Sequence, residues 1–201
     1  MPQEFLEVEV KLAVDEGVKP PGISLVDATL SITSTTTHHL SATYFDTEDL
    51  RLTRAKTALR RRTGGTDDGW HVKLPGEGGA RRELQVPLQD APGDEVPAEL
   101  RKAVSEVIGD APLVPIARVD NRRVESVLGR EGTAYAEFCD DHVSSESYLP
   151  GGQAQSWREW ELELSEAIAG TETGETLLHN ATKAMLAAGA RPAGEPSQRV
   201  K

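Results

Sequence analysis

The stretch Glu7-Val8-Glu9-Val10-Lys11 carries an ionisable residue at every second position. Successive side chains of a β-strand point to opposite faces, so a strand with this period gathers its charges on one face and its valines on the other. One such segment is typical of an antiparallel strand with a solvated face. Four later stretches have a similar period: Leu59-Arg60-Arg61-Arg62, Arg81-Arg82-Glu83-Leu84-Gln85, Arg118-Val119-Asp120-Asn121-Arg122 and Glu159-Trp160-Glu161-Leu162-Glu163.

The repetition of charged strand faces needs more than solvent to explain it. Acidic residues recur with one parity near both ends of the chain, and basic residues recur with one parity through its middle. A closed sheet with a polar interior, covered outside by helices, accounts for both observations. We therefore predict that cationic and carboxylate strands face one another.

Composition limits the fold and the ligand. With 201 residues and 37% hydrophobic content, the chain can bury a core, and we predict a single domain over residues 1–201. The net charge of −11 argues against nucleic-acid and membrane partners, which favour basic surfaces. Residues 51–82 nevertheless contain nine Lys or Arg against three Asp or Glu. A basic site within an acidic chain suits a small polyanion.

Cysteine usage and the N-terminus indicate the compartment. Cys139 is the single cysteine, so the sequence allows neither an intrachain disulfide nor a cysteine cluster for zinc. The segment Met1–Leu6 lacks the basic and apolar regions of a signal peptide, and no stretch is apolar enough for a membrane span. We expect a cytoplasmic protein.

Hydrophobic periodicity and turn residues predict the order of the elements. Helices are expected near residues 24–32 and 173–188, with a helical face over 100–108. A strand at 142–148 is left open. The other predicted strands cover 4–12, 37–46, 56–63, 69–75, 80–88, 113–128, 131–139 and 157–165.

Five motifs in order resemble the CYTH family, the triphosphate tunnel metalloenzymes. They are Glu7–Lys11, Tyr44-Phe45-Asp46-Thr47, Ala58–Arg62, Val72-Lys73-Leu74-Pro75 and Trp157–Leu164, and together they cover nearly the whole chain. The segment Ala187-Ala188-Gly189-Ala190-Arg191-Pro192 resembles the end of CYTH modules that precede a helical CHAD domain. If the chain is a fragment, a CHAD-type domain is an expected partner.

The resemblance implies an α+β fold: an eight-stranded antiparallel closed β-tunnel with a polar lumen and flanking helices. The lumen would bind a triphosphate group and a divalent metal, Mg²⁺ or Mn²⁺. Both are hard cations that prefer carboxylate oxygens and water. The predicted metal ligands are Glu7, Glu9, Asp141, Glu159 and Glu161.

Phosphate needs fixed positive donors, and the planar fork of arginine can hold two oxygens at once. Arg61, Arg82 and Arg123 have the opposite parity to the predicted binding residues and are expected on the solvent side. The predicted phosphate-binding residues are Lys11, Arg60, Arg62, Lys73, Arg81, Arg118 and Arg122, of which Lys11, Arg60, Arg62 and Lys73 are also assigned to catalysis.

Several residues leave alternatives open. Glu163 can add a carboxylate to the metal site, and Glu137 can serve either the metal or a salt bridge. His71 is expected to be hydrogen-bonded rather than catalytic. Asp120, on the predicted lumen face, should repel a bound polyphosphate. Gln85 and Gln198 stand where the family often has a carboxylate and a lysine.

These observations predict a metal-dependent hydrolase of inorganic triphosphate or a related triphosphate. Metal and arginines would stabilise the charge on the transferred phosphoryl group, so no covalent nucleophile is required. The alternatives within the family are a class IV adenylate cyclase and a thiamine triphosphatase. The alternative from another class is a non-catalytic polyphosphate-binding module.

Overall fold

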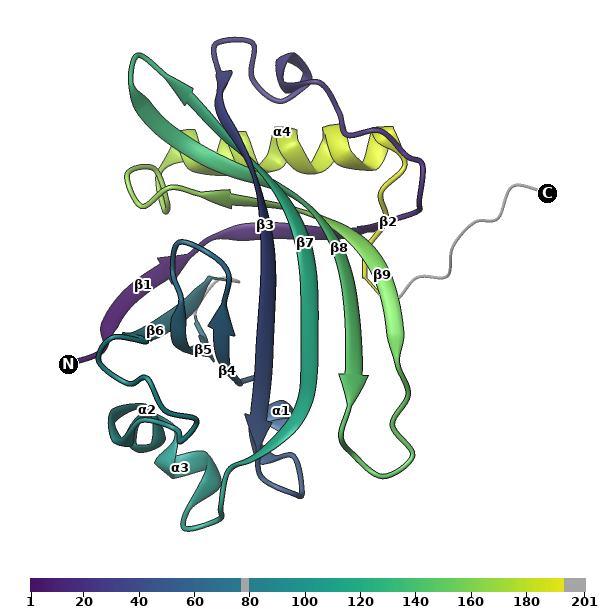
Figure 1. Cartoon of the computed structure of the whole chain (residues 1–201). Helices are drawn as coiled ribbons and strands as arrows, with labels where there is room; N and C mark the ends of the chain where they lie inside the picture. Colours follow the sequence, from purple (N-terminus) through teal and green to yellow (C-terminus); the bar gives the residue numbers. More distant parts are fainter. Residues whose placement is uncertain (77–79, 194–201) are drawn as a thin grey trace. The chain divides into compact units, whose positions relative to one another are not determined.

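A computed structural model describes residues 1–76 and 80–193 (Figure 1). Within these residues the chain forms nine strands, four α-helices and one 3-10 helix. In chain order they are β1 (Gln3–Glu7), β2 (Glu9–Val14), η1 (Ile23–Leu25), β3 (Ser31–Asp46), α1 (Arg51–Arg54), β4 (Ala58–Thr63), β5 (Gly69–Pro75), β6 (Arg81–Pro87), α2 (Ala98–Ala103), α3 (Ser105–Ile108), β7 (Val114–Arg130), β8 (Thr133–Ser147), β9 (Gln155–Leu164) and α4 (Glu172–Ala188).

The strands form one antiparallel sheet in the order β1-β6-β5-β4-β3-β7-β8-β9-β2. The antiparallel sheet with helices is confirmed, but the predicted count of eight strands is wrong by one. The predicted strand 4–12 is split at Val8, because β1 pairs with β6 whereas β2 pairs with β9. The terminal strands of the sheet order, β1 and β2, are thus separated in the chain by Val8 alone.

The chain folds as two compact units, each assembled from several stretches. Unit 1 comprises Met1–Glu7, His39–Asn121 and Ser144–Gln155. Unit 2 comprises Val8–His38, Arg122–Val143 and the described residues from Ser156 onward. The single domain over residues 1–201 stays a prediction.

Unit 1 has its core on one face of β4, β5 and β6. Leu59, Val72 and Leu84 are neighbours across the three strands and point to the same face. They pack in one buried cluster with residues of α1, α2 and α3, among them Leu52 and Leu100. Because side chains alternate along a strand, the opposite face of the same strands receives the charged residues of the sequence motifs.

Unit 2 has its core between its strands and α4. Trp160 and Leu162 of β9 pack with the Leu177, Ala181 and Met185 stripe of α4, whose spacing of four places it on one helix face. The helix begins where the Thr171 hydroxyl accepts a hydrogen bond from the Gly174 amide at 3.2 Å. It ends at Gly189, which has a φ of 112°. The other face of β9 is left to Glu159, Glu161 and Glu163.

Three predicted elements differ in extent. The helix expected at 24–32 is reduced to η1, and β3 begins at Ser31, where β-branched residues favour a strand. Thr33 of this added segment donates to the Val127 carbonyl at 3.3 Å. The segments 131–139 and 142–148 are one strand, β8. None of the helices in the described part of the chain is long and apolar enough to cross a membrane.

Candidate functional site

The polar face of unit 2 carries a cluster of three carboxylates, from Asp141 of β8 and from Glu159 and Glu161 of β9. One oxygen of each lies within 4.8 Å of the others. Asp141 and Glu161 are only 1% and 3% exposed. Since Glu159 and Glu161 alternate with the buried Trp160, the strand itself aims both carboxylates at the same side.

Two cationic side chains of unit 2 enter this cluster. Lys11 Nζ lies 2.7 Å from Glu161 Oε2 and 3.6 Å from Glu159 Oε1. Arg123 holds Asp141 through both carboxylate oxygens, and its Nη2 also donates to Glu161 Oε2 at 3.2 Å. Burial opposes the charged form of Lys11, but the charges of Glu161, Glu9 and Glu159 raise its pKa above the usual value.

The donor set of this cluster fits a hard divalent cation. Three carboxylates face two cationic side chains, so one negative charge is in excess even before a metal binds. All available ligand atoms are oxygens, which Mg²⁺ and Mn²⁺ prefer. Asp141, Glu159 and Glu161 can therefore hold a divalent metal, with Lys11 and Arg123 beside it.

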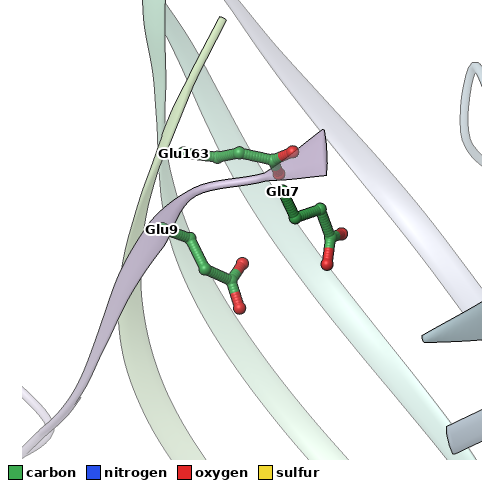
Figure 2. Close-up of side chains that lie close together, drawn as sticks. All are labelled: Glu7, Glu9 and Glu163. Carbon is green, nitrogen blue, oxygen red and sulfur yellow. The ribbon is translucent and has the colours of Figure 1, made fainter. Parts of the chain in front are cut away.

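A second pair of carboxylates lies on the same face of unit 2. Glu9 of β2 is the direct partner of Glu163 on β9, and both side chains extend to one side of the strands (Figure 2). Like charges opposite each other on neighbouring strands destabilise a sheet unless a cation screens them. Lys11, two residues from Glu9, lies on the same strand face. This pair adds oxygen donors to the polar face.

The polar face of unit 1 carries the predicted arginines. Arg60 Nη1 donates to Tyr44 Oη at 3.4 Å, and Arg60 Nε is buried without a hydrogen-bond acceptor among the described residues. Arg62 Nη2 donates to the Asp67 carboxylate. A buried arginine donor without an acceptor costs free energy, and a phosphate oxygen is a ligand that would remove this cost.

Lys73 of unit 1 lies between two buried carboxylates. Its Nζ is 2.5 Å from Glu7 Oε1 and 3.3 Å from Glu83 Oε2. Burial raises the pKa of Glu7 to about 7, against the opposing charge of Lys73. Burial acts on Glu83 in the same direction, but the hydrogen bond from His71 and the charge of Lys73 hold the pKa of Glu83 well below its usual value. Glu83 is thus the ionised partner of Lys73.

The remaining predicted phosphate-binding residues lie outside these clusters. Arg81, Arg118 and Arg122 are exposed. Arg118 donates to both carboxylate oxygens of Asp120, at 3.0 and 3.1 Å. The phosphate-binding roles of these three arginines stay a prediction.

The predicted solvent-side position of Arg123 is wrong. Arg123 is half-buried and bonded to Asp141 and Glu161, so the polar face of β7 carries the odd-numbered residues at this point. Val119 suggested the opposite parity. Val124 and Leu128 further along the strand, which share the parity of Arg122, are the sequence signal that indicates the correct face.

Sequence reasoning also missed two partners of the unit 1 cations. Asp67 lies in the turn between β4 and β5, where no strand period applies. Glu83 lies in a motif of mixed charge, Arg81-Arg82-Glu83-Leu84-Gln85, which does not show which cation it pairs with. Gln85, a departure from the family pattern, donates to Glu83 Oε1 at 2.6 Å. Gln198, the other departure, lies outside the described residues.

The chain is thus an antiparallel sheet protein with strand faces of carboxylates, lysines and arginines. The CYTH domain matches residues 6–188, and the chain belongs to the CYTH family. Two uncharacterised Mycobacterium tuberculosis proteins, from strains CDC 1551 and H37Rv, are each 41% identical to it over 207 residues. The match covers 98% of this chain, which spans about two fifths (40%) of the length of each relative.

Solved structures show the same fold at low sequence identity. A candidate adenylate cyclase from Bacillus halodurans is 17% identical, with a TM-score of 0.59 over 97% of this chain and 96% of its own. A candidate adenylyl cyclase from Hippeastrum with a dominant triphosphatase activity is 19% identical, with a TM-score of 0.50 over 95% of this chain and 92% of its own. These likenesses support the fold prediction. They do not identify the substrate of this chain.

Proposed function

We propose that this chain is a divalent-metal-dependent hydrolase of inorganic triphosphate or a related triphosphate, with Mg²⁺ or Mn²⁺ as its metal. The observation that carries the proposal is the cluster of the buried Asp141 and Glu161 with the partly buried Glu159, with Lys11 and Arg123 beside it. The dominant triphosphatase activity of the Hippeastrum protein supports the same reaction within the fold.

The acidic residues of unit 2 would hold the metal, with Asp141, Glu159 and Glu161 as one set and the predicted ligand Glu9 on the same face. The metal-binding role predicted for Glu7 of unit 1 stays a prediction. A bound divalent metal neutralises phosphate charge and lowers the pKa of a coordinated water. Lys11 and Arg123 have fixed positive charges beside the carboxylates. On exchange of their carboxylate partners for phosphate oxygens, both would stabilise the negative charge of the substrate.

The cations of unit 1 would bind phosphate oxygens. Arg60 has a buried donor without an acceptor, and Arg62 and Lys73 have carboxylate partners with which a phosphate can compete. Charge-assisted hydrogen bonds from arginine to phosphate are among the strongest in proteins. In this proposal catalysis depends on charge stabilisation and positioning, as expected for phosphoryl transfer to water.

A phosphate-release screen tests the proposal. Tripolyphosphate, ATP and thiamine triphosphate are each offered with Mg²⁺, with Mn²⁺ and with a chelator, and phosphate, pyrophosphate and cyclic AMP are measured. We expect metal-dependent phosphate release, fastest from tripolyphosphate. Cyclic AMP with pyrophosphate from ATP, without triphosphate hydrolysis, would identify a cyclase. Tight binding of tripolyphosphate in calorimetry without product under any metal condition would identify a binding module.

A further inference from the structure

His71 of β5 is a buried histidine with a partner on each ring nitrogen. It is 1% exposed. Its Nδ1 lies 2.8 Å from Glu83 Oε1, and its Nε2 lies 2.9 Å from the backbone carbonyl oxygen of Asp67. The two partners belong to different elements, since Glu83 is on β6 and Asp67 is in the turn before β5.

Both ring nitrogens of His71 face hydrogen-bond acceptors. A backbone carbonyl only accepts, so Nε2 donates to the Asp67 carbonyl oxygen. Nδ1 faces Glu83 Oε1, which also accepts from Gln85 Nε2. His71 therefore links the Glu83 carboxylate of β6 to the turn that carries Asp67.

Each partner of His71 in turn contacts one cation of the proposed phosphate site. Asp67 accepts a hydrogen bond from Arg62 through its carboxylate, while its carbonyl is held by the histidine. Glu83 Oε2 lies 3.3 Å from Lys73 Nζ, while Glu83 Oε1 is held by the histidine. Hydrogen-bonded carboxylates keep their orientation, and a fixed carboxylate fixes its cation.

The turn that carries Asp67 is itself constrained. Gly64 has a φ of 94°, and a Cβ at this position would lie 1.9 Å from the His39 carbonyl oxygen, so the backbone passes close to β3 there. The Gly65 amide donates to Asp68 Oδ1 at 2.9 Å. With one end of the turn fixed in this way, the bond from His71 to the Asp67 carbonyl holds the backbone from which the Asp67 side chain extends to Arg62.

We propose that His71 is a positioning residue of the phosphate site, which orients Arg62 through Asp67 and Lys73 through Glu83. The inference rests on the proposed function, because it assumes that these two cations bind phosphate. A histidine that only filled the core would need no ionic partners. His71 instead contacts the Glu83 carboxylate and the Asp67 backbone carbonyl, and the side chains of both residues are partners of the predicted phosphate-binding residues.

Two substitutions separate the two hydrogen bonds of the His71 ring. The amide nitrogen of an asparagine lies close to the position of Nδ1, and that of a glutamine close to the position of Nε2. His71→Asn should therefore keep the bond to Glu83 and lose the bond to Asp67, whereas His71→Gln should do the reverse. Each should weaken the binding of tripolyphosphate with Mg²⁺ about tenfold in calorimetry, the effect expected for one bond to a charged group.

Double-mutant cycles decide whether the effect passes through the two cations. In a Lys73→Met background, His71→Gln should change the dissociation constant less than twofold, while His71→Asn keeps its tenfold effect. In an Arg62→Met background, His71→Asn should change the dissociation constant less than twofold, while His71→Gln keeps its tenfold effect. His39→Gln, at an exposed position on β3, is the matched control and should bind as the wild type does.

The outcomes separate this proposal from the proposed function. If the histidine variants fold, by circular dichroism, and weaken binding equally in every background, His71 has only a structural role and the proposal fails. If the wild type binds tripolyphosphate with the expected couplings but releases no phosphate, the proposal stands and hydrolysis fails. If the wild type does not bind tripolyphosphate with Mg²⁺, both fail.

Discussion

Arg123 binds Asp141 in a two-point ion pair: its Nε donates to Oδ1 at 2.9 Å and its Nη2 donates to Oδ2 at 2.7 Å. Lys11 binds Glu161 in the same cluster at 2.7 Å. The carboxylates that can hold a metal are thus paired with two cationic side chains. A divalent cation brings the same charge as these two together, so metal binding and release of Lys11 and Arg123 should be linked.

Glu159 offers the most direct test of the metal site, because it is the least buried of the three carboxylates and its contact with Lys11 is long, at 3.6 Å. Glu159→Gln keeps the shape and removes a charged ligand. We expect the Mg²⁺ concentration for half-maximal triphosphatase activity to rise about tenfold, since losing one charge-assisted ligand costs about 1.5 to 3 kcal/mol.

The control for this experiment is Glu166→Gln, at an exposed position just after β9. It should leave the metal dependence unchanged, and circular dichroism should show both variants folded. A Glu159→Gln variant with the Mg²⁺ dependence of the wild type would remove Glu159 from the metal site.

Arg123→Gln should destabilise the chain, because it leaves the buried Asp141 and Glu161 carboxylates with less positive charge. Removing one partner of a buried ion pair typically costs about 3 to 5 kcal/mol, measurable by urea unfolding. Excess Mn²⁺ should recover more stability in this variant than in the wild type, because a bound cation replaces the lost charge. An equal Mn²⁺ effect on both proteins would argue against a metal site at these carboxylates.

The pKa of Glu7 gives a pH-dependent prediction. The folded-state pKa of about 7 lies above the ordinary value of 4.5, so the stability from this group is complete below pH 4.5 and is lost as pH rises through 7. In the presence of a chelator, Glu7→Gln should therefore gain stability relative to the wild type between pH 4.5 and 8, by up to about 3 kcal/mol. Urea unfolding at several pH values measures this difference.

Glu4→Gln provides the control on the same strand. The hydrogen bond from Arg82 lowers the pKa of Glu4, so the stability from Glu4 is lost as pH falls rather than as it rises. The two variants should therefore deviate from the wild type in opposite directions. Parallel curves for Glu7→Gln and the wild type would show that burial does not govern Glu7.

The sequence pattern predicted the strands best where one period runs through a whole strand. On β9, Trp160 and Leu162 are buried and Glu159 and Glu161 share the polar face, as the alternation required. The pattern could not reveal that β1 and β2 change partner at Val8, because pairing depends on distant residues. The pattern also could not predict the partners of His71. Glu83 is twelve positions away in the sequence, and Asp67 contributes a backbone oxygen, which every residue has.

The register of β7 yields the last prediction. Asp120 was predicted to face a bound polyphosphate, yet its carboxylate accepts hydrogen bonds from Arg118. The side chains of Arg118 and Asp120 are 53% and 45% exposed. Asn121 shares the strand parity of Arg123, and its Oδ1 is buried without a hydrogen-bond donor among the described residues. A one-residue shift in register exchanges the two faces of a strand, so Asn121 takes the place predicted for Asp120.

Asp120→Asn should therefore leave the KM for tripolyphosphate within about twofold of the wild type, because an exposed ion pair contributes little. Asn121→Asp should raise this KM about tenfold or more, since it adds a negative charge on the face that carries Arg123. Asp120→Asn replaces a carboxylate with an amide, and Asn121→Asp replaces an amide with a carboxylate at the next position, so each variant is a control for the other. A raised KM in Asn121→Asp with normal folding would establish that the odd-numbered residues of β7 face the substrate. A change confined to Asp120→Asn would restore the predicted register and place Arg122 rather than Arg123 beside the phosphate.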